Sequence, residues 1–308
     1  MDTLKSEEAL MARWDARREP LVSVICLAYN HAEFIRETLD GFIRQETDFP
    51  FEVIVHDDAS TDNTAAIIRE YAARYPHVIR PIYQQQNQYS LGVPFSTRLF
   101  AQARGQYIAY CEGDDYWTDP QKLQIQVDFL ERHPDYVITY HDAYMFNGQG
   151  VLRSPHLQGR YRRDASAMEL MRGRPLSTLT VCFRNLIKDL PPELHGVEVL
   201  DICWWSLLGA HGKGKFLAQI RPAAYRIHEG GIFSMRSSKQ RIRMSLHAYY
   251  NLARYYQRIG DQGLHDYFLI QVFCHALALI SPPAKLVALG KALQNTSLNL
   301  LRRLSPTA

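Results

Sequence analysis

A continuous apolar run, LVSVICLAY over residues 21–29, constrains the fold more than any other feature of the sequence. A strand that is apolar on both faces is typical of a parallel sheet covered by helices on both sides. FEVIVHDDAS predicts a second strand that runs into polar residues, and VIRPIYQ and QYIAYC predict two more. Helices are predicted over 31–45, 61–75 and 95–104. This alternation predicts βαβ units in an α/β fold with an open, mostly parallel sheet flanked by helices.

The composition allows one large domain, or one domain with an appendage, because 308 residues that are 46% hydrophobic can build a full core. The formal net charge of +3, without a basic and aromatic binding pattern, argues against a nucleic-acid partner. Five cysteines without a CxxC pair predict buried thiols in a reducing cytosol. Residues 1–19 lack the apolar stretch of a signal peptide, and polar residues make 264–280 a poor membrane span.

Three regions are predicted along the chain. Residues 1–20 carry a charged amphipathic helix over 1–19 that ends before Pro20. Residues 21–235 form the main domain, whose halves are 21–117 and 118–235. Residues 236–308 are mainly helical, with a break at SPP. Within the main domain, Asp62 or Thr61 is expected to cap the helix over 61–75.

Polar side chains gather where the predicted strands end. The segment CEGDDYW, residues 111–117, places carboxylates directly after a strand, and Asp-Asp ends another strand. In open α/β sheets ligands bind beyond the carboxyl ends of the strands. The chemistry of the clustered carboxylates leaves three options: a divalent metal that holds a diphosphate, an acid/base pair, or a capped turn. The polar residues at these ends are Asn30, Asp57, Asp58, Asp114 and Asp115.

The order of the motifs resembles that of the family-2 glycosyltransferases, which have the Rossmann-like GT-A fold. VSVICLAYN resembles the opening strand and loop of that family, and FEVIVHDDASTDNT its second strand with Asp-Asp. ARGQYIAYCEGDDYW resembles the element with the DxD metal motif, LDICWW the later acidic base, and YRIHEGGIFS the terminal Tyr-Arg-x-His segment. The resemblance covers roughly residues 21–235. Two departures are Glu112 in place of the first Asp of DxD, and Leu200 before Asp201.

The resemblance implies an inverting glycosyltransferase with a helical C-terminal appendage. Its donor would be a nucleotide-sugar, with a UDP-sugar expected, and Mn²⁺ or Mg²⁺ would be the cofactor. Its acceptor would be a glycan or lipid-linked molecule in the biosynthesis of a surface polysaccharide or glycolipid. The expected location is cytoplasmic, with peripheral contact at the inner face of the membrane.

The resemblance also assigns roles to individual residues. Asp115 is expected to be the most direct metal ligand, Asp114 a metal or ribose contact, and His228 a third metal or phosphate contact. Arg226 is expected to hold a phosphate oxygen. Asp201 is the candidate base, because inverting transfer needs a proton acceptor opposite the leaving group. The remaining donor contacts are Leu27, Tyr29, Asn30 and Asp58, with Tyr29 stacked on the base and Asp58 accepting the uracil N3–H.

Structural alternatives stand beside these roles. Asp57 and Asp58 also suit a turn whose carboxylates bind backbone N–H groups. Tyr29 also suits a core position at a strand end, and Asp201 also suits a helix cap. Trp204 and Trp205 could form a platform for a sugar or could pack in the core.

Two rival functions remain open from the sequence. A nucleotidyltransferase would need a Gly-rich loop with Lys or Arg near the first strand, and AYNHAEF offers none. A GT-A-like protein that binds nucleotide-sugars without catalysis is suggested by Glu112 and Leu200. The basic segments 236–247 and 283–304 predict weak, salt-sensitive membrane association. The alternative for these segments is packing on the main domain, or on a second subunit of a homo-oligomer.

Overall fold

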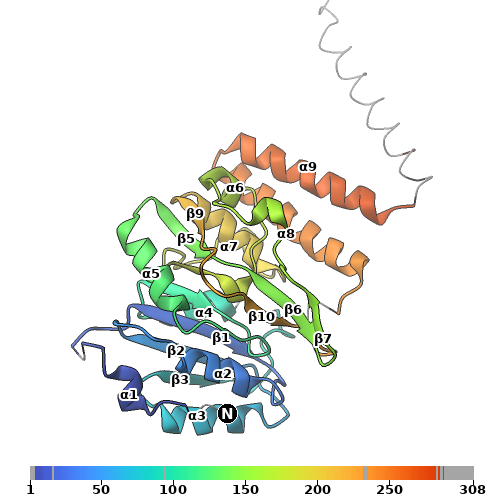
Figure 1. The fold of residues 1–308 in the computed structure, drawn as a ribbon. Coiled ribbons are helices and arrows are strands. Elements are labelled where there is room, and N and C mark those ends of the chain that lie inside the picture. Colours follow the sequence, from blue (N-terminus) through green and yellow to red (C-terminus); the bar gives the residue numbers. More distant parts are fainter. Residues whose placement is uncertain are drawn as a thin grey trace, which may run out of the picture. The chain divides into compact units, whose positions relative to one another are not determined.

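The protein is described here from a computed structural model that covers residues 4–15, 17–92, 95–231 and 235–281, together with 284 and 287. The chain divides into two compact units, Met1–Met235 and Arg236–Ala308. The first unit is an α/β fold built on a seven-stranded sheet with the strand order β3-β2-β1-β4-β8-β5-β9 (Figure 1). A second, three-stranded sheet has the order β10-β6-β7.

The first half of this unit contains the βαβ units that the sequence predicts. Its strands β3, β2, β1 and β4 pair in parallel. Every residue of β2 is buried, and β1 is buried at all positions but Leu27, which explains why both read as apolar runs. The strands are β1 (Val22–Ala28), β2 (Phe51–Asp57), β3 (Ile79–Tyr83) and β4 (Tyr107–Tyr110), and the helices are α2 (Ile35–Ile43), α3 (Thr64–Arg74) and α4 (Phe95–Gln102).

Two helix starts differ from the sequence prediction. Among the described residues of 1–19 the α-helix is α1 (Glu7–Met11), much shorter than predicted, and side chains in and after it contact the main domain. The carboxylate of Glu7 accepts the His77 backbone N–H, and the ring of Trp14 packs edge-on against Phe51 at 5.1 Å. The N-cap of α3 is Asn63, and Asp62 binds the amide and hydroxyl of Thr64 from one position earlier.

The second half of the first unit adds an antiparallel strand and the small sheet. Strand β8 pairs antiparallel with both β4 and β5, whereas β9 pairs in parallel with β5. The strands are β5 (Tyr136–Tyr140), β6 (Ala143–Asn147), β7 (Gly150–Arg153), β8 (Cys182–Arg184), β9 (Lys213–Phe216) and β10 (Ala223–Arg226). The α-helices are α5 (Lys122–Arg132), α6 (Ala167–Met171) and α7 (Leu200–Gly209), and short 3-10 helices span Gly159–Tyr161, Thr178–Thr180 and Pro192–Leu194.

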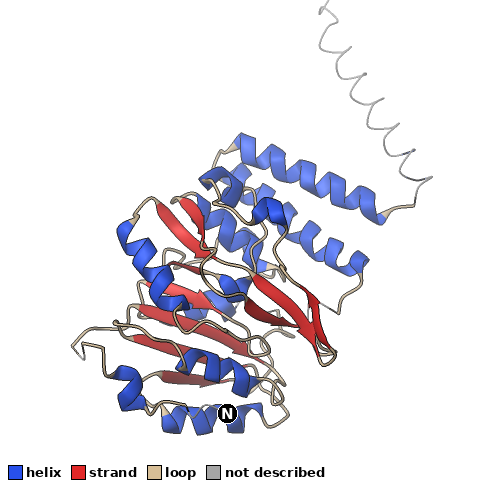
Figure 2. Ribbon diagram, in the orientation of Figure 1, coloured by secondary structure: helices blue, strands red, loops and turns tan. Residues whose placement is uncertain are grey.

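Helices cover both faces of the large sheet, as Figure 2 shows. Residues from α2, α3 and α5 pack with one face, and residues from α4, α6 and α7 pack with the other. Strand β1 serves both cores, because Val24 belongs to the first cluster and Ile25 to the second. Trp204 and Trp205 are buried in the second cluster, so their role is core packing and not a platform for a sugar.

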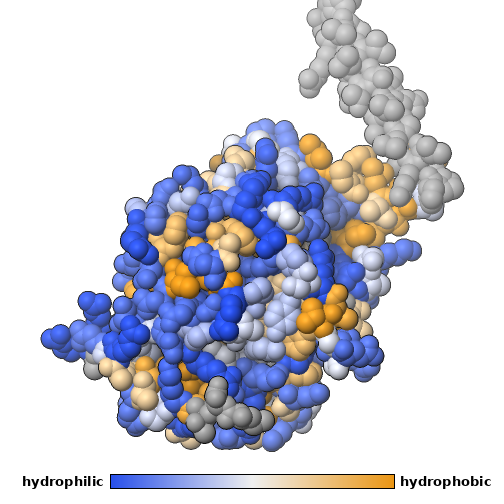
Figure 3. Space-filling view, in the orientation of Figure 1, coloured by the Kyte–Doolittle hydropathy of each residue, from blue (hydrophilic) through white to orange (hydrophobic). Residues whose placement is uncertain are grey.

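The second unit contains a helical hairpin. Helix α8 (Ser238–Arg258) and helix α9 (Gln262–Leu279) are joined at Gly260, which has a positive φ of 81°. The rings of Tyr256 and Phe268 stack between them with centroids 5.7 Å apart. Figure 3 shows hydrophobic surface over α9, where exposed apolar side chains include Leu269, Ile270 and Phe273.

No helix in the described part of the chain is long and apolar enough to cross a membrane. The basic segment 236–247 lies at the start of α8. The basic pattern over 283–304 falls outside the described residues except for 284 and 287, so the membrane prediction for that segment stays a prediction.

Candidate functional site

The loop that follows β4 is fastened to the carboxyl end of β1 and to α2. The amide of Gly113 donates to the Leu27 carbonyl at 2.8 Å, and the hydroxyl of Thr38 bonds to the carbonyls of Gly113 and Asp115. A Cβ atom at Gly113 would lie 2.9 Å from the Ile35 side chain and 3.0 Å from Nδ1 of His31. Glycine is therefore needed here for close approach, and it brings the three acidic side chains of this loop to the edge of the sheet.

Asp114 lies between two imidazoles. Its Oδ2 is 2.9 Å from Nε2 of His228 and 3.9 Å from Nε2 of His31. Burial alone would raise the pKa of Asp114, but the His228 hydrogen bond and the neighbouring imidazoles hold it below the usual value. One ligand atom from each of these side chains lies within 4.8 Å of the others, and no further such group is found among the described residues.

Asp115 is not a member of this cluster. Its side chain is buried, and its Oδ1 accepts the backbone N–H of Arg226 at 2.7 Å. Burial raises the pKa of Asp115 well above its usual value, and the charges of Asp114 and Glu112 raise it further. One oxygen of this carboxylate fastens the loop to β10, and the expectation that Asp115 is the most direct metal ligand stays a prediction.

Arg226 also attaches the loop after β4 to its neighbours. Its Nε donates to the Asp114 carbonyl at 2.8 Å, and its guanidinium pairs with the Glu37 carboxylate. The guanidinium carbon also lies 4.7 Å from the ring centroid of Phe34 and 4.6 Å from that of Phe146. Arg226 thus holds the loop, α2 and β10 together, and its expected contact with a phosphate oxygen stays a prediction.

Glu112 and Asp201 form a second pair of carboxylates in the same region. Both oxygens of Glu112 lie 2.9 Å from the Thr178 hydroxyl, and burial together with the charge of Asp114 raises the pKa of Glu112 to about 7. Asp201 is in the first turn of α7, whose N-cap is Val199. Burial raises its pKa to about 6, although the amides of Ile202 and Asp201 offset part of that rise. One Asp201 oxygen is buried and has no partner among the described residues.

The predicted nucleoside contacts lie at the ends of β1 and β2. Both oxygens of Asp58 accept backbone N–H groups, from Gln88 at 2.7 Å and from Tyr89 at 3.0 Å. The turn alternative therefore holds for Asp58, which closes the loop after β3. Asn30 has a positive φ of 54°, and its side-chain oxygen accepts the Thr61 amide at 2.8 Å. Tyr29 is 41% exposed, so the core alternative for its ring does not hold.

Sequence reasoning missed His31 and Thr178. His31 has no metal-like spacing to another histidine, because the residues it approaches, Asp114 and His228, lie far away in the chain. The available signal was its position directly after Tyr29-Asn30, at the end of a strand whose neighbours also end in polar residues. Thr178 lies in a short 3-10 helix and carries no local signal of its own.

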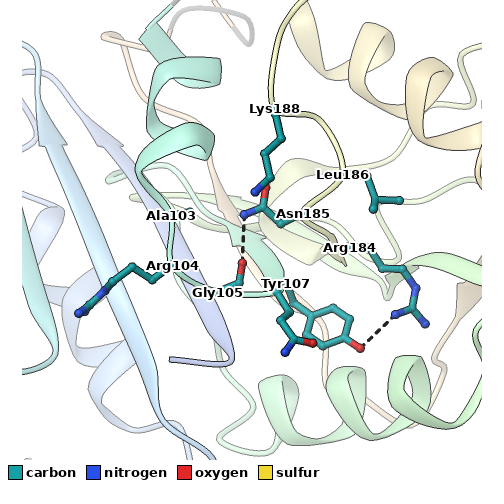
Figure 4. Close-up of a pocket in the computed structure, with 9 residues that line it drawn as sticks. Ala103, Arg104, Gly105, Tyr107, Arg184, Asn185, Leu186 and Lys188 are labelled. Carbon is teal, nitrogen blue, oxygen red and sulfur yellow. Dashed lines mark hydrogen bonds between the residues drawn. The ribbon is translucent and has the colours of Figure 1, made fainter. Parts of the chain in front are cut away.

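A separate cavity of about 410 Å³ lies at the other edge of the sheet, beside the start of β4 (Figure 4). In Figure 4 the Asn185 side chain donates to the Gly105 carbonyl at 3.0 Å and Arg184 donates to the Tyr107 hydroxyl at 3.2 Å. Arg184 also bonds to backbone carbonyls of the neighbouring chain segments. The cavity lacks the carboxylates of the opposite edge, so it is not the candidate site.

The sequence is similar to a known protein family and to curated proteins. The model of the family described as "Glycosyl transferase family 2" matches residues 23–189. An uncharacterized protein of Mycobacterium tuberculosis (strain ATCC 25618 / H37Rv) is 41% identical over 217 residues, which are 69% of this chain and 60% of that protein. The chain thus spans about 60% of the length of this relative.

Two solved structures share the fold. Staphylococcus aureus TarS 1-349 in complex with UDP-GlcNAc matches with a TM-score of 0.60 and 20% identity over 82% of this chain and 72% of that chain. The mannosyltransferase PcManGT of Pyrobaculum calidifontis, in complex with GDP-Man and Mn²⁺, matches with a TM-score of 0.53 and 19% identity over 91% and 81%. With the family model covering most of the large sheet, these matches show that the chain has the GT-A fold and belongs to glycosyl transferase family 2.

Proposed function

We propose that this chain is an inverting glycosyltransferase that moves a sugar from a UDP-sugar to a hydroxyl group of a glycan or lipid-linked acceptor, in the biosynthesis of a surface polysaccharide or glycolipid. One observation carries the proposal. At one edge of the sheet lie a cluster suited to a cation and a half-buried carboxylate, Asp201, suited to accept a proton. The charges of Asp114 and Asp201 both raise the pKa of Glu112. The S. aureus relative TarS, named a poly(ribitol-phosphate) beta-N-acetylglucosaminyltransferase, supports the donor and acceptor classes.

The residues of the cluster fit a divalent ion. Asp114 is ionised because its pKa is held low, and the nitrogen of His228 lies beside its oxygen. Both side chains keep about one sixth of their surface exposed, at 17% for Asp114 and 15% for His228, so other ligands can reach them. Bound there, Mn²⁺ or Mg²⁺ would neutralise the negative charge of the departing diphosphate. Asp115 and Arg226 would keep the loop in place for this role.

Asp201 would act as the base. Its oxygen without a partner is free to take the proton of the acceptor hydroxyl while that hydroxyl oxygen bonds to the anomeric carbon. Attack on the face opposite the departing diphosphate inverts the configuration. A pKa of about 6 leaves Asp201 ionised at neutral pH and a stronger base than an ordinary aspartate. Glu112, with a pKa of about 7, carries a proton part of the time and so reduces repulsion among the carboxylates.

The nucleoside would bind at the ends of β1 and β2. The exposed ring of Tyr29 offers a face on which a base can stack. A carboxylate has about four acceptor sites, so Asp58 can hold the loop amides and still accept an imide N–H. Asn30 would shape the site by accepting the Thr61 amide, which joins the segments after β1 and β2. Leu27 would hold the loop after β4 at the site, because its carbonyl accepts the Gly113 amide.

Incubation of the full chain with a panel of UDP-sugars and Mn²⁺ tests this function. The expected result is release of free UDP, which should be lost in Asp114→Ala and retained in Asp189→Asn, a control in which an exposed carboxylate is changed. Release of pyrophosphate from a nucleoside triphosphate and a sugar phosphate would instead indicate a nucleotidyltransferase. Binding of UDP without release from any sugar donor would indicate a binding protein. Full activity in EDTA would remove the metal from the proposal.

A further inference from the structure

The imidazole of His31 lies beside the Asp114–His228 pair, and within the described part of the chain no hydrogen bond of the ring explains its position. Its Nε2 lies 3.9 Å from Oδ2 of Asp114, beyond hydrogen-bond distance. Its Nδ1 is buried without a partner among the described residues. We infer that His31 is a third protein ligand of the cation, and that this nitrogen-rich cluster prefers Mn²⁺ and similar transition-metal ions over Mg²⁺. The inference rests on the cation site of the proposed function.

The distances fit three ligands of one ion. Two ligand atoms that share an ion at bond lengths of about 2.1 Å lie roughly 3 to 4.2 Å apart, depending on the angle between them. The Asp114 oxygen lies 2.9 Å from the His228 nitrogen and 3.9 Å from the His31 nitrogen. The two imidazole rings meet edge-on, with centroids 6.0 Å apart and planes at 85°. Such an arrangement lets nitrogen atoms from both rings approach a common point.

The cluster is also open on one side. The side chains of His31, Asp114 and His228 are 14%, 17% and 15% exposed, so none is sealed from solvent. An ion held by three protein atoms needs further ligands to complete its coordination, and the exposed side leaves room for them. A diphosphate would approach from that side.

The local backbone holds His31 in this position. Its amide donates to the Thr64 hydroxyl at 2.8 Å, and its carbonyl accepts the amides of Phe34 and Ile35 at the start of α2. The preceding residue, Asn30, makes the left-handed turn that sends the chain toward the loop after β4. At that loop Gly113 has no Cβ to block the approach, since a Cβ there would lie 3.0 Å from Nδ1 of His31.

The choice of metal follows from the donor atoms. Mg²⁺ prefers oxygen ligands in a strict octahedron and gives up its water reluctantly. Imidazole nitrogens suit zinc, iron and other transition-metal ions, and Mn²⁺ belongs to the same first-row series while also suiting carboxylate oxygens. A site with two imidazoles and one carboxylate should therefore bind Mn²⁺ more tightly than Mg²⁺. Removing one imidazole should weaken Mn²⁺ binding more than Mg²⁺ binding.

Electron paramagnetic resonance of the full chain with Mn²⁺, with and without UDP, tests this inference without using activity. The loss of free Mn²⁺ signal gives its Kd, competition gives the Kd of Mg²⁺, and pulsed measurements count the directly bound imidazole nitrogens. We expect two bound imidazoles in the wild type and one in His31→Asn. We also expect Mn²⁺ to bind His31→Asn at least about tenfold more weakly, with a smaller change for Mg²⁺. His211→Asn, a change at an exposed histidine, is the control and should match the wild type.

The outcomes separate this inference from the proposed function. An unchanged Mn²⁺ Kd in His31→Asn, or a single bound imidazole in the wild type, overturns the inference alone. Two bound imidazoles in a protein that releases UDP from no sugar donor keep the inference and overturn the proposed function. A wild type that binds no Mn²⁺ under either condition overturns the inference and the metal-dependent part of the function. His31→Gln, with its thermal unfolding checked, replaces His31→Asn if that variant does not fold.

Discussion

At the scale of single residues, the site keeps neighbouring carboxylates in different protonation states. Hydrogen bonding to His228 lowers the pKa of Asp114, whereas burial raises those of Glu112 and Asp201 to about 7 and about 6. A cation ligand must be ionised and a base must hold its proton weakly enough to release it again. The environment of each side chain thus supplies the property that its proposed role requires.

The half-buried Asp201 carboxylate should cost stability at neutral pH. Its folded pKa of about 6 lies above the usual 3.8, so the folded state binds the proton more tightly than the unfolded state. The contribution of Asp201 to wild-type stability should therefore fall as pH rises from about 4 to about 6, by on the order of 2 to 3 kcal/mol. Asp201→Asn stays neutral, so it should be more stable than the wild type at pH 7.5 and close to it at pH 4.5.

Urea unfolding of the wild type and Asp201→Asn at both pH values measures this difference. UDP binding should be retained in the variant while sugar transfer is lost, because only the proton acceptor is removed. Asp189→Asn serves again as the control at an exposed position. A variant that is less stable than the wild type at both pH values, or one that still transfers sugar, would contradict the assignment of Asp201.

The sequence predicts where these residues lie in the fold, but not which contacts each side chain makes. The GDD motif at a strand end predicts that Asp114 and Asp115 lie at the carboxyl edge of the sheet, but local sequence does not tell which of them contacts a residue more than a hundred positions away. His228 turns toward Asp114, while the backbone of Arg226 binds Asp115. These contacts depend on tertiary structure, because β10, which ends at Arg226, pairs with β6 within the small sheet. The contacts of His31 could not be predicted from local sequence for the same reason.

At the scale of elements, the parallel strands could be predicted because β1 is buried on both faces, at all positions but Leu27, and therefore reads as a nearly continuous apolar run. Strand β8 gives no such signal. It spans only Cys182–Arg184, and its partners β4 and β5 lie far from it in the chain. The helix predicted over 1–19 is only Glu7–Met11 among the described residues, and Glu7 and Trp14 bind His77 and Thr47, which lie in the segments before β3 and β2.

Glu52 of β2 links β1, β3 and the segment before β4 through hydrogen bonds and ion pairs. Its side chain is fully buried, and it accepts the Ser23 hydroxyl at 2.7 Å and the amide and Nε of Arg104 at 2.9 Å each. It also pairs with Arg80 of β3. Burial alone would raise the pKa of Glu52, but these hydrogen bonds hold it below the usual value. Its stabilising contribution is therefore present above a pH of about 4.5 and is lost as pH falls below that value.

Glu52→Gln should lower the free energy of unfolding at pH 7 by about 2 to 3 kcal/mol, because charge-assisted hydrogen bonds become neutral ones and the two arginines lose a counter-charge. Glu19→Gln is the matched control: Glu19 lies 3.8 Å from Arg104 but is 80% exposed, so its loss should be small. Chemical denaturation of the three proteins provides the measurement. Equal losses in the two variants would mean that burial of Glu52 adds nothing.

At the scale of the whole molecule, the candidate site and both hydrophobic cores belong to the first unit. Neither core cluster contains a residue beyond Tyr225, and His228 is the last candidate site residue. The helical hairpin of the second unit has its own buried side chains, among them Leu252 and Phe268. The division at Met235 therefore separates the proposed chemistry from the helices that follow.

A chain ending at Met235 should fold and keep the donor site. Its core is complete without later residues, so it should unfold in one cooperative thermal transition and bind UDP with Mn²⁺ within about threefold of the full chain. A chain ending at Val199 is the control. It lacks α7 and the buried Trp204 and Trp205, and removing large buried aromatic rings costs about 3 to 5 kcal/mol each, so it should not fold. Calorimetry and titration with UDP measure both properties. If the chain ending at Met235 is unfolded, or folds without binding UDP, the second unit is required by the first, because no other part of the chain has been removed.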